Sequence, residues 1–173
     1  SLPQNIKWGQ AIIAKWNTKQ IDPIPLVIDG EAVRTANEGK GYDPSNPSRP
    51  LYTYSLAGWE ELNRALTTAK KQEDSWRNTP IQERCALLAE TAKILRENRA
   101  DQIGAMIADG GKRLLEADME LSETIDFAEY YLRSMCQYAS YQDIKWSPKG
   151  TILVASPWNF PNSISGGGIF AAL

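Results

Sequence analysis

The chain has 173 residues and a formal net charge of -2, and this length suits one or at most two domains. The near balance of acidic and basic residues gives no basic surface for nucleic acid or for an anionic membrane. No apolar run approaches the roughly 18–20 residues of a membrane-spanning helix, and the first residues lack the features of a signal peptide. These features favour the cytosol or an organelle lumen, and we expect a cytoplasmic protein.

Histidine is absent, and cysteine occurs only at Cys85 and Cys136. The sequence therefore holds no Ser-His-Asp or Cys-His catalytic unit and no histidine-ligated metal. Cys85 lies on an apolar helical row between Ile81 and Leu88, so we interpret it as a small buried residue rather than a nucleophile. The same interpretation applies to Cys136, and we predict no metal site.

The first third of the chain predicts one short helix and two strands. Apolar spacing predicts an amphipathic helix over 6–16. Residues 25–30 are typical of a strand that closes in an Asp-Gly turn. Residues 36–50 are rich in Gly, Pro, Asn and Ser and predict a loop, and 51–56 predict a second strand.

Three long helices follow. Apolar residues at spacings of three and four predict helices over 59–76, 80–109 and 114–138. We expect Thr79 to cap the second of them, and we expect that helix to break near Asn98.

Three acidic residues, Glu116, Glu120 and Glu123, share one face of the third helix. They could bind a cation, but no ligand of another type accompanies them. We therefore interpret them as a solvated helix face.

The end of the chain predicts a strand over 151–155, a proline-bounded corner over 157–161, and the start of a helix. Gly166, Gly167 and Gly168 lack the spacing of a phosphate-binding loop, so we expect them to let that helix pack closely against a neighbour or a ligand. A parallel sheet needs several strands joined by crossovers. We therefore predict that residues 1–173 form the front of a larger α/β domain. This part should be mainly helical, and its Rossmann-type sheet should be incomplete.

The corner is the candidate site. Pro157 and Pro161 restrain the backbone on either side of Trp158, Asn159 and Phe160. The carboxyl end of a strand is where open α/β sheets bind ligands, and amide donors held there can stabilise an oxyanion. Physical reasoning leaves a second interpretation open, in which the segment is only a strand-to-helix turn.

The segment 149–161 resembles the signature strand and turn of the NAD(P)-dependent aldehyde dehydrogenase superfamily. Further segments resemble other motifs of that superfamily in the same order, namely 25–31, 43–47, 75–84, Gly111-Lys112 and Glu116-Ala-Asp118. Residues 124–131 and the extra N-terminal helix resemble the L-glutamate γ-semialdehyde (1-pyrroline-5-carboxylate) dehydrogenases. In some bacteria that domain is fused behind a proline dehydrogenase, in the proline utilisation A proteins.

The resemblance implies an aldehyde substrate, NAD as cofactor and a homo-oligomeric enzyme. It implies that Asn159 is the side-chain donor of an oxyanion hole, and that Ser156, Pro157 and Trp158 are cofactor-binding residues beside the nicotinamide. In the family, the cysteine nucleophile and the glutamate base lie later in the chain. We therefore expect half an active site here, and no activity from these residues alone. Two alternatives are another class of aldehyde and a non-enzymatic interaction module that keeps the helical front of the fold.

Overall fold

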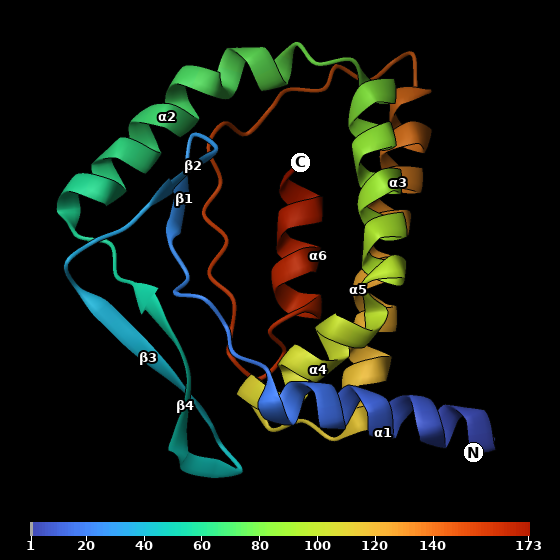
Figure 1. Cartoon of the computed structure of the whole chain (residues 1–173). Helices are drawn as coiled ribbons and strands as arrows, with labels where there is room; N and C mark the ends of the chain where they lie inside the picture. The colour runs from blue at the N-terminus through green and yellow to red at the C-terminus, as the bar shows by residue number, and fades with distance from the viewer. Residues whose placement is uncertain (1) are drawn as a thin grey trace.

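The computed structural model describes residues 2–173 and is mainly helical, with two small sheets (Figure 1). In chain order the elements are α1 (Pro3–Thr18), β1 (Leu26–Ile28), β2 (Glu31–Val33), β3 (Glu38–Asp43), β4 (Asn46–Ser55), α2 (Trp59–Arg77), α3 (Ile81–Glu97), α4 (Arg99–Gly110), α5 (Leu114–Ala139) and α6 (Ser163–Ala172). This confirms the predicted fold class, an α/β fold dominated by helices with an incomplete sheet.

Both sheets are antiparallel hairpins. β1 pairs with β2 around the turn at Asp29 and Gly30, where both residues have positive φ, 57° and 77°, as the Asp-Gly signal predicts. β3 pairs with β4, so the predicted loop over 36–50 is wrong. Gly39 and Gly41 leave room there for the rings of the paired tyrosines, because a β-carbon on either glycine would lie 2.3 Å from a tyrosine ring atom.

The helical predictions are confirmed in their placement. The second predicted helix divides at Asn98, whose backbone N–H and side-chain amide both donate to the Ile94 carbonyl. The predicted cap at Thr79 is wrong. Its hydroxyl donates to the Ser75 carbonyl at the end of α2, and α3 begins at Ile81 without a side-chain cap.

The core lies where α1, α3, α4, α5 and α6 meet. Its buried members come from these helices and from β4; they are Ile12, Trp16, Leu51, Leu88, Ala92, Ile103, Met106, Ala108, Ala117, Leu121, Ile125, Ala128 and Phe170. Cys85 is buried beside this core, as predicted. Cys136 is exposed, so its interpretation as a buried residue is wrong, because it lies in the last turn of α5, where residues 136–139 are all exposed.

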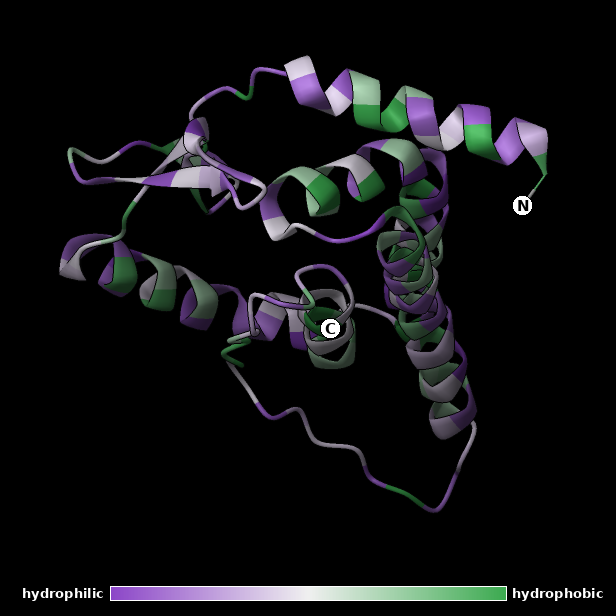
Figure 2. Ribbon diagram, turned by 90° about the horizontal axis from the view of Figure 1, so that it is seen from below, coloured by the Kyte–Doolittle hydropathy of each residue, from purple (hydrophilic) through white to green (hydrophobic). Residues whose placement is uncertain are grey.

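α2 stands apart from this bundle. It has no buried residue among its 19, and Trp59, Leu62 and Leu66 are exposed. Figure 2 shows hydrophobic positions alternating with hydrophilic ones along this separate helix. Among residues 2–173, no helix combines the length and the apolar character needed to cross a bilayer.

The predicted strand over 151–155 does not form, since residues 152–157 have neither helical nor strand assignment. A strand requires hydrogen bonds to a neighbour, and none of residues 2–173 pairs with this run. Ile152 and Leu153 are exposed, with Leu153 89% exposed, whereas Val154 lies against Gly168 of α6. The segment is not helical either.

α6 packs closely against α5 at Gly166 and Gly167, and against Val154 at Gly168. A β-carbon at Gly166 would lie 2.8 Å from the Thr124 methyl group, and one at Gly167 would lie 3.0 Å from the Phe127 ring. Side chains at these positions would push α6 away from α5, so the close-packing interpretation of the glycines is confirmed. The corner that precedes α6 is thereby held beside the N-terminal half of α5.

Candidate active site

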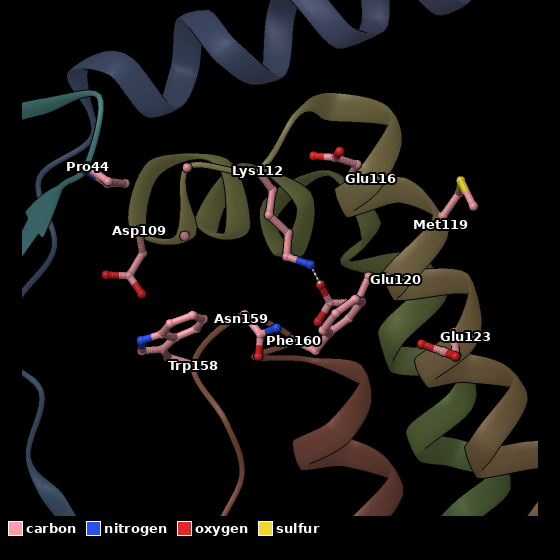
Figure 3. A pocket seen from close by; sticks show the side chains of 12 residues that line it. Pro44, Asp109, Lys112, Glu116, Met119, Glu120, Glu123, Trp158, Asn159 and Phe160 are labelled. Carbon is pink, nitrogen blue, oxygen red and sulfur yellow. Dashed lines mark ion pairs between the residues drawn. The ribbon is translucent and has the colours of Figure 1, made fainter.

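An open pocket of about 950 Å³ lies between the corner and the start of α5. Trp158, Asn159 and Phe160 form one wall (Figure 3). The opposite walls come from Pro44 in the β3–β4 turn, from the end of α4 and from α5; their residues are Asp109, Gly110, Gly111, Lys112, Glu116, Met119, Glu120 and Glu123. Three segments far apart in the sequence thus surround one space.

Glu120 fixes the corner to α5. Its side chain is only 1% exposed, and its Oε1 accepts the backbone N–H groups of Asn162 at 2.7 Å and Ser163 at 3.1 Å. The first N–H groups of a helix lack partners inside the helix and attract negative charge. Glu120 therefore caps α6 from another helix and holds the backbone just after Asn159.

Lys112 completes this arrangement. Its ammonium forms an ion pair with Glu120 Oε2 (Figure 3) and lies 4.0 Å from the centre of the Phe160 ring, a cation–π distance. The Lys112 side chain is 12% exposed, so the ion pair lies mostly out of water, where an unpaired charge is costly. Gly111 precedes it with a φ of 62°, the left-handed conformation that ends α4.

A further polar contact supports the corner. The Asn162 side-chain amide donates to Gln102 Oε1 of α4 at 2.8 Å. Asn162 is therefore held through its backbone by α5 and through its side chain by α4. Two other helices therefore fix the residue that directly follows the corner.

The four residues singled out from the sequence lie together on the corner. Trp158 and Asn159 line the pocket, whereas Ser156 and Pro157 lie outside it. All four are exposed, and Trp158 is 83% exposed. The Asn159 amide has no hydrogen-bond partner recorded among residues 2–173, so it is available to donate to a molecule in the pocket.

Sequence reasoning missed Lys112 and Glu120. The solvated-face interpretation is wrong for Glu120, which is 3% exposed, and holds for Glu116 and Glu123, which are exposed. The signal was present: Glu120 lies three residues after Ala117 and four before Thr124, both buried, so helical spacing puts it on the inner side of α5.

The pocket can donate a hydrogen bond but holds no nucleophile. Neither cysteine lines it, and no cluster of three or more His, Cys, Asp or Glu residues suited to a metal ion occurs among residues 2–173. Burial and a hydrogen bond with Cys136 raise the pKa of Cys85 to about 11, which leaves it almost wholly as thiol at neutral pH. Among residues 2–173 the pocket offers the Asn159 amide as a hydrogen-bond donor, and no thiol lines it.

Comparison with known proteins places the fold and its corner in a family. Residues 33–173 match the model of the aldehyde dehydrogenase family, which covers most of the chain. The chain therefore belongs to the aldehyde dehydrogenase family.

The relatives that match are longer proteins. 1-Pyrroline-5-carboxylate dehydrogenase of Bacillus pumilus is 32% identical over 153 residues, which cover 83% of this chain and 30% of that protein. A solved structure of 1-pyrroline-5-carboxylate dehydrogenase from Thermus with bound NAD superposes with a TM-score of 0.86 at 26% identity, over 97% of this chain and 36% of the Thermus chain.

A third match shows the fold alone. The proline utilization A protein of Bdellovibrio bacteriovorus superposes with a TM-score of 0.89 at 23% identity, over 98% of this chain and 19% of that protein. The chain thus spans about a third or less of the length of these relatives.

Proposed function

We propose that this chain is the N-terminal part of an NAD-dependent aldehyde dehydrogenase that oxidises L-glutamate γ-semialdehyde to L-glutamate in proline catabolism. The observation that carries the proposal is the Asn159 corner, which is fixed by Glu120 and opens onto a pocket in a chain of the aldehyde dehydrogenase family. The substrate follows from the curated relatives named 1-pyrroline-5-carboxylate dehydrogenase. Residues 1–173 would form part of the NAD-binding domain, and the catalytic domain would lie outside this chain.

Asn159 is assigned the role of oxyanion donor. When a thiolate attacks an aldehyde carbon, negative charge develops on the carbonyl oxygen, and an amide N–H aimed at that oxygen lowers the barrier. The corner suits this role because Asn162, which directly follows it, is held before any substrate arrives, through its backbone by α5 and through its side chain by α4, so little reorganisation is needed.

The cofactor contacts are assigned to Ser156, Pro157 and Trp158. These exposed residues directly precede Asn159, which fits a nicotinamide placed beside the reacting carbon. NAD, when bound, accepts the hydride that leaves that carbon. Assembly of the complete enzyme as a homo-oligomer and a cytoplasmic location belong to the same proposal.

Two alternatives compete with this proposal, and the reading frame downstream of Leu173 separates them. A following segment with the cysteine and glutamate of the family motifs supports the enzyme. A transcript in which no such segment follows supports an interaction module that retains the helical front of the fold. An enzyme for another aldehyde would retain both residues and differ in substrate preference.

The chain alone is predicted to be inactive. Covalent aldehyde oxidation needs a thiolate within reach of the oxyanion donor, and the two thiols of residues 2–173 lie outside the pocket. We expect the purified 173-residue chain to form no NADH from glutamate semialdehyde and to show no NAD binding by calorimetry. If this chain oxidised the aldehyde and the Cys85→Ser variant did not, Cys85 would be a nucleophile, and the prediction would be wrong.

A further inference from the structure

The two cysteines meet at the far end of the helical bundle from the pocket. Cys85 lies in the first turns of α3, and Cys136 lies in the last turns of α5. Their sulfur atoms are 2.9 Å apart, although the residues are 51 positions apart in sequence. A disulfide has an S–S length of about 2.05 Å, so the two sulfurs need to approach by less than about 1 Å to bond.

The two thiols differ in access to solvent. Cys136 is exposed, whereas Cys85 is buried and its thiol also contacts the Leu132 carbonyl at 3.9 Å. An oxidant from solvent therefore reaches Cys136 first. Cys85 is shielded from solvent but lies in contact with the sulfur that has been oxidised.

This arrangement is not explained by the proposed chemistry. Neither cysteine lines the pocket, and a buried thiol needs no second thiol beside it for packing. Reactive cysteines that act in redox responses are typically accessible and lie next to a second cysteine that forms the disulfide. Cys136 and Cys85 match these two roles.

We propose that Cys136 and Cys85 form a peroxide-responsive modification site that closes a reversible disulfide between α5 and α3. In the first step the Cys136 thiol gives its proton to solvent and its thiolate attacks one oxygen of hydrogen peroxide; the O–O bond breaks, Cys136 becomes a sulfenic acid, and the hydroxide that leaves takes up a proton to become water. In the second step the small thiolate fraction of Cys85 attacks the Cys136 sulfur, the S–O bond breaks, and the hydroxide that leaves takes up the proton released by Cys85 to become a second water. Two thiols are oxidised, one peroxide is reduced, and a dithiol such as dithiothreitol reverses the change by exchange.

The disulfide would join two helices that make extensive contact along their lengths (Figure 1). A disulfide between residues 51 positions apart restricts the conformations of the unfolded chain and so stabilises the folded state. The modification thus acts on the bundle that supports the pocket without placing new atoms in the pocket.

Non-reducing peptide mapping of the 173-residue chain tests the proposal. After treatment with hydrogen peroxide, trypsin should release peptides 85–93 and 134–145 joined to each other, with a combined mass lower by two hydrogens. Alkylation should find two free thiols before treatment and none after it, and dithiothreitol should restore both. The protein should remain a monomer on a non-reducing gel.

Matched variants test the order of the two steps. In Cys85→Ala, peroxide should leave Cys136 as a sulfenic acid that dimedone traps. In Cys136→Ser, which changes an exposed position, Cys85 should remain a free thiol under the same treatment. Retention of both free thiols in the unaltered chain, dimedone labelling of Cys85, or cross-linking only between separate chains would overturn the proposal.

Discussion

Asn159→Ala is expected to lower kcat by about 10²–10³-fold in the complete protein. The complete protein means this chain together with the segments found in its longer relatives. The amide donor lies on a corner held by α4 and α5, so its loss removes a group already aimed at the pocket. Since the donor acts on charge that develops in the transition state, kcat and kcat/KM should fall together while KM changes little. Steady-state kinetics of NADH formation measure both quantities.

A matched control separates this effect from general damage. Asn63 is exposed on α2, far from the pocket-lining residues, and Asn63→Ala should keep kcat within about twofold, as expected for a surface change away from special features. An Asn159→Ala enzyme that retains more than about a tenth of the original kcat would contradict the assigned role.

Lys112→Met is expected to destabilise the fold by about 3–5 kcal/mol, because it leaves the buried Glu120 carboxylate without its partner charge. The remaining N–H donors of Asn162 and Ser163 satisfy only one oxygen of that carboxylate. The free energy of unfolding from urea titration of the 173-residue chain measures the loss.

The double variant gives the sharper result. Lys112→Met with Glu120→Gln removes both charges and keeps an acceptor oxygen for α6, so it should recover a large part of the stability lost by Lys112→Met alone. If the single and double variants are equally unstable, the effect comes from packing of the Lys112 stem against Phe160, and the ion pair would not be what holds the corner.

Much of the helical framework was predictable because its signals are local. Apolar spacing placed the long helices, and Asn98 marked the division between α3 and α4. The β3–β4 hairpin was missed because the glycines of β3, taken alone, suggest a loop. In the structure they leave space for the rings of Tyr52 and Tyr54 on the partner strand. That role depends on strand pairing, which a local composition does not reveal.

The site was predictable only in part. The corner was found because prolines restrict the backbone locally, and the resemblance named Asn159. Helical spacing places Glu120 on the inner side of α5, but its link to Ser163 joins residues 43 positions apart, and a long-range contact of this kind leaves no local pattern. Likewise, Thr151–Ala155 has strand-like composition, but a strand needs a partner, and residues 2–173 supply none.

The most direct test of the proposed function is the rate of NADH formation by the complete protein with L-glutamate γ-semialdehyde and with a simple aliphatic aldehyde such as propanal. The proposal predicts NAD-dependent turnover of both or of the first alone, with the higher kcat/KM for glutamate semialdehyde. A preference for propanal would contradict the substrate assignment, and absence of turnover with every aldehyde would contradict the enzyme itself.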